Sequence, residues 1–574
     1  MNGLILIIST ENKQFEKTPI SWKKPFDFQH QHFHRSCLEK TYQIEQFSSI
    51  KFESEKHWIE TDEFFFVSEG IIQNINELCK ANNVDNVNQL ITKFHKNNNK
   101  TFFKDFEGNY IGLYLDKKNK TWTSFNNKTG MKKLFFFQNQ DFVVLSSDLK
   151  ILIQCLSFHH IPYSLNEASS YLLLTSGFMH ENMTLVNEVK QLRAGEYAFI
   201  SDNKLQINSY YNLKDIEQTN DSKSTIIETL DYKFKEAVKL EFELDLKHNY
   251  RHLSTLSGGL DSRMTTLIAH KMGYNDQLLL NFSEKGYADE IIAKDIAAKY
   301  NIELKHEELN AKSLLPIDKV VSVNDGLNIY TSCSHVFSIL SKINQPTNGI
   351  LHTGMIGDAV MGSFISRIRE SEPSISSGLY SKGLINKTIG ILKQSISNYP
   401  TEELYKFYNR AFLGANNGFL FFDLLGESSS PFLNSSFLSY AYSIPRKLKF
   451  HERVYIDWIK TLHPEIAKFT WECIGGKPTN NEFRRKIYRC RRAVVKRLPI
   501  KTMWKNNMNP EQLWYENDPI VKVTLDSYFD SHIDLLSGYL ELRNDVFKLY
   551  LTGNITEKTQ ALTLLSAYKL LFNE

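Results

Sequence analysis

The segment of this chain best suited to chemistry is a serine- and glycine-rich turn between an apolar strand and a helix, Leu253-Ser254-Thr255-Leu256-Ser257-Gly258-Gly259-Leu260-Asp261-Ser262-Arg263. Glycines let the backbone approach a ligand closely, and the start of the helix presents free N–H groups and a partial positive charge. Ser257 and Ser262 add hydroxyl donors. The Asp261 carboxylate could face a polyphosphate only across a cation such as Mg²⁺. The turn predicts a site whose amides hold phosphate groups.

A second strand leads into glycine turns and an acid further along, at Ile350-Leu351-His352-Thr353-Gly354-Met355-Ile356-Gly357-Asp358-Ala359-Val360-Met361-Gly362. Between the two turns, predicted strands alternate with predicted helices, which is typical of a parallel sheet with crossover helices. The predicted elements are strands at 252–256, 278–282 and 302–306 and helices at 262–271 and 289–300. Each of the two turns therefore follows a predicted strand and carries one carboxylate, Asp261 in the first turn and Asp358 in the second.

The remainder of the chain divides into a β-rich part and a helical part. Short apolar runs at 64–67, 110–115 and 141–145 predict strands, and 87–95 and 165–175 predict helices. The polar stretch 214–224 is the predicted linker, because 574 residues exceed what one core usually supports. We expect domains at 1–213 and 225–574. From about Ser363 the chain is predicted to be mostly helical, with terminal helices at 533–550 and 557–571.

The first turn matches the SGGxDS signature of PP-loop ATP pyrophosphatases and lacks the lysine of the P-loop of other NTPases. The second turn is similar to the TGxGGDE or SGEGADE element of the asparagine synthetase family. The chain resembles that family over almost its whole length. Further similar segments are Phe106–Asn109, Thr129–Phe136, Leu145–Lys150, Gln191–Gly195, Tyr287–Glu290, Pro431–Asn434 and Ser443–Pro445.

The resemblance implies an α/β fold in which an N-terminal αββα glutaminase-like (Ntn) sandwich precedes a parallel-sheet PP-loop synthetase domain with a helical C-terminal part. ATP as a substrate and Mg²⁺ are the implied ligands, and Asp261 and Asp358 are the implied metal-binding pair. The implied nucleotide-binding residues are Leu256, Ser257, Gly258, Gly259, Asp261, Ser262, Phe282, Thr353 and Gly354.

The N-terminal half departs from the family at two positions. Glutamine hydrolysis in the family needs a cysteine directly after the initiator Met, and Asn2 stands there. Glu69 replaces an oxyanion-hole asparagine with a negative charge, which has the wrong sign for stabilising an oxyanion. We expect this domain to lack glutaminase activity.

The synthetase half departs as well. Met355 stands where the family has Glu and cannot transfer protons, and Ala359 removes an acid after Asp358. The family's late RxK motif has no clear counterpart. Lys477, in a glycine-flanked loop, is the candidate for its catalytic lysine, with Lys468 as second choice; an exposed loop lysine without a role is the competing interpretation.

The function implied is ATP-dependent amide formation: adenylation of a small-molecule carboxylate, by default aspartate, followed by attack of an amine or ammonia and release of AMP and pyrophosphate. A specialised amide synthetase of polysaccharide, peptide or secondary-metabolite biosynthesis is one alternative. A nucleotide-binding scaffold with a decayed catalytic apparatus is another. A tRNA-modifying PP-loop enzyme is a remote third, since the sequence contains no CxxC pair and its net charge is close to zero.

The charge and the apolar runs of the sequence limit the kinds of partner that we expect. The formal net charge of +3 argues against a nucleic-acid-binding surface over the whole chain. The run Leu4–Ile8 is too short for a signal peptide or a membrane span, so we expect a cytoplasmic protein, with a homodimer as a possible assembly. A basic run at 484–497 is best explained as a solvated helix face, with a membrane or nucleic-acid contact as the alternative.

Overall fold

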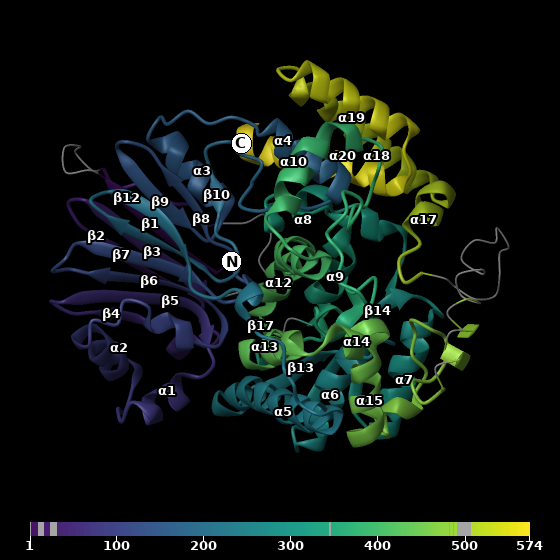
Figure 1. Ribbon diagram of the computed structural model, residues 1–574. Helices are drawn as coiled ribbons and strands as arrows, with labels where there is room; N and C mark the ends of the chain where they lie inside the picture. Colours follow the sequence, from purple (N-terminus) through teal and green to yellow (C-terminus); the bar gives the residue numbers. More distant parts are fainter. Residues whose placement is uncertain are drawn as a thin grey trace.

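The computed structural model describes residues 2–9, 16–22, 31–343, 346–481, 483–485, 487–488, 490 and 507–573. Within them lie two six-stranded antiparallel sheets, a five-stranded parallel sheet and numerous helices (Figure 1). Most of the basic run 484–497 lies outside the described residues. This mixed α/β architecture, antiparallel first, parallel later and helical at the end, confirms the predicted fold class.

The two antiparallel sheets are built from the N-terminal part of the chain. The order of the first is β10 (Lys190–Gln191), β8 (Phe135–Gln138), β9 (Phe142–Ser146), β1 (Gly3–Ser9), β3 (Tyr42–Ser49), β2 (His32–Leu38). The order of the second is β12 (Lys204–Ser209), β11 (Glu196–Ser201), β7 (Thr121–Asn126), β6 (Gly108–Asp116), β5 (Phe64–Ile72), β4 (Trp58–Glu60).

Side chains that alternate along the strands produce four layers. In β1, Leu4 and Leu6 pack between the two sheets against residues of β5 such as Phe65, whereas Ile5 and Ile7 face the opposite side and join a cluster with α3 (Leu149–Phe158) and α4 (Glu167–Ser176). On the far side of the second sheet, β5 packs against α1 (Ile75–Ala81) and α2 (Val87–Lys96). Successive residues of a strand point to opposite faces, so this apolar pattern yields the predicted αββα sandwich.

The parallel sheet has the order β15 (Glu303–Leu309), β14 (Gln277–Glu284), β13 (Arg251–Thr255), β16 (Asn348–His352), β17 (Ser428–Ser429). The helices α5 (Lys223–Lys247), α6 (Asp261–Lys271), α7 (Ala288–Tyr300), α8 (Ile317–Asn324) and α9 (Thr331–Ile343) precede or connect its strands. The carboxyl ends of β13 and β16, which carry the two predicted turns, are neighbours.

Helices make up most of the rest. They are α10 (Ile385–Ser397), α11 (Glu402–Tyr405), α12 (Asn417–Phe422), α13 (Ser435–Ser443), α14 (Arg446–Lys449), α15 (Arg453–Leu462), α17 (Glu511–Asn517), α18 (Pro519–His532), α19 (Leu540–Thr552) and α20 (Ile555–Tyr568). The predicted helix at 533–550 is wrong at its start, because Ile533–Leu536 forms a separate turn and α19 begins only at Leu540. In the described part of the chain, no helix is long and apolar enough to span a bilayer.

Candidate functional site

The serine–glycine turn joins β13 to α6, and side chains of the protein hold it in shape. The Ser257 amide donates to Ser262 Oγ at 2.9 Å, and the Gly259 amide donates to Ser257 Oγ at 3.2 Å. The Gly258 amide donates to Oδ1 of Asp289, in the first turn of α7, at 2.9 Å. These three amides therefore have partners within the protein, unlike the expectation that the turn's amides hold phosphates. Helix α6 starts at Leu260 without a side-chain cap, so its first-turn amides can meet a ligand.

Gly258 is required by close packing. An added Cβ would lie 2.6 Å from Asp289 Oδ1 and 2.7 Å from Glu472 Cβ. The backbone oxygen of Gly258 accepts hydrogen bonds from the Glu472 amide at 3.0 Å and from the Arg263 guanidinium at 3.0 Å. The turn is thus enclosed by α7 on one side and by a late segment of the chain on the other.

The two predicted metal ligands meet. The Asp358 amide donates to Asp261 Oδ2 at 3.0 Å, and the hydroxyl of Tyr455, on α15, donates to Asp261 Oδ1 at 2.9 Å. An added Cβ at Gly357 would lie 2.7 Å from Asp261 Cγ, so the second turn packs directly on the first acid. Burial, and then the neighbouring Asp358 carboxylate, raises the pKa of Asp261 well above its usual range. The Asp358 side chain is exposed and accepts a hydrogen bond from Ser363 at 2.8 Å.

A pocket of about 240 Å³ opens beside these acids at the carboxyl end of the parallel sheet. Its lining includes eight of the nine predicted nucleotide-binding residues: Leu256, Ser257, Gly259, Asp261, Ser262, Phe282, Thr353 and Gly354. The ninth, Gly258, lies behind them with its amide turned toward Asp289. Asn281, Asp289, Met355, Phe422 and Met508 complete the wall together with Thr255 and Leu280.

The backbone of the second turn carries strain beside this pocket. Ile356 has a φ of 67°, a left-handed conformation that β-branched residues seldom adopt. Its side chain is buried, so packing holds the conformation in place. Strain of this kind persists where surrounding contacts determine the backbone, often at functional sites.

The predicted lysines are not part of the pocket. Lys477 and Lys468 are both exposed, and neither contributes to the lining. Among the residues that the structure describes, that lining contains no lysine or arginine. The cation nearest to the turn is instead Arg263, which is buried in α6 and donates to the carbonyl oxygens of Gly258 and, at 2.7 Å, Thr470.

Sequence reasoning did not assign three residues that shape this site. Asp289 lies in a segment that resembles the family, but nothing in its spacing showed that it accepts the Gly258 amide. Tyr455 and Arg263 lie in helices whose pattern predicts only burial. For Arg263, a charged residue directly after the SGGxDS turn is the one sequence feature that could have raised the question.

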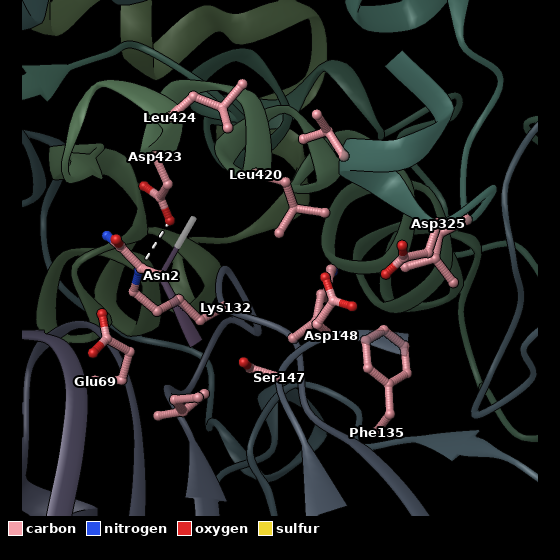
Figure 2. Close-up of a pocket in the computed structure, with 14 residues that line it drawn as sticks. Asn2, Glu69, Lys132, Phe135, Ser147, Asp148, Asp325, Leu420, Asp423 and Leu424 are labelled. Carbon is pink, nitrogen blue, oxygen red and sulfur yellow. Dashed lines mark hydrogen bonds and ion pairs between the residues drawn. The ribbon is translucent and has the colours of Figure 1, made fainter. Parts of the chain in front are cut away.

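Asn2 and Glu69, the two departures in the N-terminal half, line one cavity of about 70 Å³ (Figure 2). Asn2 Oδ1 accepts a hydrogen bond from the Ser49 amide at 2.8 Å. Glu69 accepts hydrogen bonds from Ser48 Oγ at 2.8 Å and Gln46 Nε2 at 3.1 Å, and burial raises the pKa of its carboxyl. By volume the cavity accommodates a few water molecules.

A buried group of two histidines and two carboxylates lies beneath the ends of β13 and β16. Asp245 Oδ2 is 2.8 Å from His252 Nδ1 and 2.8 Å from His352 Nε2, and His352 Nδ1 is 3.3 Å from Glu241. The spacing of the Asp245, His252 and His352 atoms would suit a metal ion. Burial alone would lower the pKa of His352, but Asp245 and Glu241 raise it to about 9. Because these imidazoles and carboxylates are hydrogen-bonded to one another, we interpret the group as an internal ion-pair network.

Comparisons with known proteins leave the family open. No family model matches the sequence, and no curated protein matches it. Among solved structures, the chain is similar to a glutamine phosphoribosylpyrophosphate amidotransferase from B. subtilis complexed with ADP and GMP, at 10% identity over 66% of this chain and 81% of that one, with a TM-score of 0.21. A structure described as the allosteric regulatory enzyme of purine biosynthesis has 9% identity over 73% and 88%, with a TM-score of 0.22. Scores this low carry no conclusion about activity, so the interpretation of the site depends on its own geometry.

Proposed function

We propose that the chain is an ATP-dependent amide-forming ligase of the asparagine synthetase type that does not hydrolyse glutamine itself. One observation carries the proposal: Asp261, which lines the pocket beside an uncapped helix start, accepts a hydrogen bond from the amide of Asp358, and the two acids follow neighbouring parallel strands. Ligands of α/β proteins commonly bind at the carboxyl ends of parallel strands.

The acid pair suits Mg²⁺. Hard carboxylate oxygens, one from Asp261 and one from the exposed Asp358, are ligands that this ion uses together with phosphate oxygens. The groups that contact Asp261 are a hydroxyl and an amide, which do not neutralise its charge. When bound, Mg²⁺ would neutralise charge on the triphosphate.

The chain's own residues would bind and orient the reactants. First-turn amides of α6 would face phosphate oxygens, and Leu256, Phe282 and Thr353 would enclose the nucleoside. An oxygen of the substrate carboxylate attacks the α-phosphorus, and the bond to the bridging oxygen breaks to release pyrophosphate. The amine then attacks the acyl carbon, and AMP leaves. Positioning and charge neutralisation supply the rate enhancement.

Met355 restricts the second half of the reaction. Its thioether lines the pocket and lies against Gly418 of α12, so this wall is apolar where the family has a carboxylate. The wall cannot accept a proton from the attacking amine. We therefore infer that the amine enters the pocket uncharged, as ammonia or a primary amine. A specialised synthetase that acts on a carboxylate other than aspartate is the alternative within this proposal.

The test is ATP–pyrophosphate exchange measured over a panel of carboxylic acids, with ammonium and glutamine compared as nitrogen donors. We expect exchange with at least one acid, at least about a hundred-fold loss in Asp261→Ala and Asp358→Ala, and activity with ammonium but not glutamine. Asp62→Ala, at an exposed turn of the N-terminal half, is the matched control. Exchange that persists in Asp261→Ala would refute the proposal.

A nucleotide-binding scaffold is the second candidate. The absence of lysine and arginine from the described pocket lining favours it, because a pyrophosphate leaving group is normally stabilised by such a cation. Calorimetry distinguishes the two candidates: a scaffold binds Mg·ATP but releases no pyrophosphate with any acid or amine.

A further inference from the structure

Strand β17 is a short edge strand of the parallel sheet and contacts the N-terminal half of the chain. It has only two residues, Ser428 and Ser429, and forms the edge of the sheet. Its inner side pairs with β16. Edge strands leave backbone groups without a partner strand, and here side chains from the N-terminal sandwich take that place.

Three carboxamides of the N-terminal half contact this edge. Asn109 Nδ2 donates to the Ser428 carbonyl at 3.1 Å, and Gln73 Nε2 donates to Ser429 Oγ at 3.0 Å. Asn2 Nδ2 donates to the carbonyl oxygen of Gly426, just before the strand, at 3.2 Å. Asn109 and Gln73 are buried. The residue that stands in place of a nucleophile thus joins the two halves of the chain.

Buried charges reinforce the same contact. Lys132 Nζ lies 3.0 Å from Asp423 Oδ2 and 3.1 Å from Glu427 Oε2, and Lys56 Nζ lies 3.3 Å from Glu427 Oε1. Lys132 and Asp423 meet at the cavity that Asn2 and Glu69 line (Figure 2). Removing one member of such a buried set leaves the others uncompensated.

The opposite side of the same segment holds the nucleotide pocket. The Ser429 carbonyl accepts hydrogen bonds from the Thr353 amide at 2.9 Å and from Thr353 Oγ1 at 3.0 Å. Ser430 Oγ donates to the Met355 carbonyl at 3.0 Å. Thr353 and Met355 both line the pocket. A continuous set of polar contacts therefore connects the sandwich to the second turn of the site.

We propose that Asn2, Gln73, Asn109 and Lys132 are positioning residues for the nucleotide pocket, acting through Glu427–Ser430 on Thr353 and Met355. The N-terminal half then holds the second turn in its conformation, whether or not it hydrolyses any amide. The expected change in ATP affinity rests on the proposed function, whereas the expected change in hydrogen exchange does not.

The experiment compares the Gln73→Ala/Asn109→Ala double variant with wild type in the full chain. We expect hydrogen exchange of the amides at 350–356 to accelerate about ten-fold without nucleotide, because each lost hydrogen bond contributes modestly to local stability. We also expect the Kd and KM for ATP to rise about five- to ten-fold, with kcat changed by less than about two-fold. Asn2→Ala is the second variant, in case the double variant does not fold, and is expected to show a smaller change of the same kind.

Tyr171→Phe and Tyr211→Phe are the matched controls. Each removes one hydrogen bond to the second half of the chain away from β17, to Asp545 and Ser439 respectively, and neither should alter exchange at 350–356 or ATP affinity. Unchanged exchange in folded Gln73→Ala/Asn109→Ala protein, or equal changes in the tyrosine controls, would overturn the inference. If wild type binds no ATP, the proposed function fails, but the exchange measurement still decides the positioning role.

Discussion

Two of the acid-lined pockets in the described part of the chain surround their acids with opposite kinds of neighbour. In the N-terminal cavity, Lys132 lies between Asp423 and Glu427, and Glu69 accepts hydrogen bonds from neutral donors. In the pocket of the parallel sheet, Asp261 belongs to the lining and Asp358 lies beside it outside the lining, and Asp261 accepts hydrogen bonds from a hydroxyl and an amide. The first cavity measures about 70 Å³ and the second about 240 Å³.

The difference agrees with the structural role that we propose for the first pocket and the ligand-binding role that we propose for the second. Matched buried charges satisfy one another and allow the surrounding residues to pack closely. Adjacent like charges raise the free energy of the ligand-free protein and are relieved when a cation binds. We therefore interpret the first pocket as part of the contact between the two halves of the chain, and the proposed metal–phosphate site remains a prediction for the second.

The largest expected effect comes from removing a buried positive charge at the contact between the two halves of the chain. Lys132→Met should destabilise the protein by about 3–5 kcal/mol, because buried Asp423 would lose its ion pair with Lys132, and buried Glu427 would lose one ion pair while it keeps the one with Lys56. Urea unfolding measures the change. A combined Lys132→Met/Asp423→Asn variant should recover part of the loss, and a loss below about 1 kcal/mol in Lys132→Met would show that these charges are not matched as the distances indicate.

The neighbouring Lys133 gives a pH-dependent test. Its side-chain nitrogen donates to the carbonyl oxygens of Gly130 and Phe412, and burial lowers its pKa to about 7 from 10.5. Between pH 7 and 10.5 the unfolded chain then binds more protons than the folded one, so this group makes stability rise with pH. Lys133→Met should lack that rise, on the order of 3 kcal/mol.

Melting temperatures of wild type and Lys133→Met from pH 7 to 10 provide the measurement. The variant should be most favourable, relative to wild type, at pH 7 and lose that advantage as the pH increases. Parallel pH profiles for the two proteins would contradict a lysine that is neutral when folded.

Two neighbouring glycines in the first turn differ in how closely the protein packs around them. Gly258→Ala should destabilise the protein by about 1–3 kcal/mol, because its Cβ would overlap Asp289 and Glu472. Gly259→Ala is the control, since its nearest neighbour, Ser257 Oγ, would lie at 3.2 Å and can rotate. Thermal unfolding of both variants decides; equal effects would mean that the turn does not pack as described.

The smallest effect concerns the unmatched acid. Asp261→Asn removes one of two adjacent charges, so we expect the ligand-free protein to lose less than about 1 kcal/mol of stability or to gain some. This is the opposite of Lys132→Met and is measured by the same urea unfolding. A loss of several kcal/mol would instead show that Asp261 is a structural carboxylate.

The site was partly predictable because its turns are local. The order of residues in Ser257–Ser262 suffices to indicate a strand, a tight turn and a helix start, and β13 and α6 lie within a residue of the predicted positions. Lys477 does not line the pocket, and its assignment as the catalytic lysine stays a prediction. Its loop has no periodic pattern, so nothing local fixes where the side chain points.

The sequence alone determined the alternation of elements, the parallel sheet and the two acid-bearing turns, because these follow from hydrophobic periodicity and turn chemistry between near neighbours, whereas the αββα sandwich was implied by the family resemblance. Only the tertiary structure decided which groups meet: Asp358 and Asp261 are 97 positions apart, Tyr455 and Asp261 are 194 apart, and Lys132 and Asp423 are 291 apart. Such contacts depend on how sheets and helices pack against one another, and a local sequence pattern does not determine that packing.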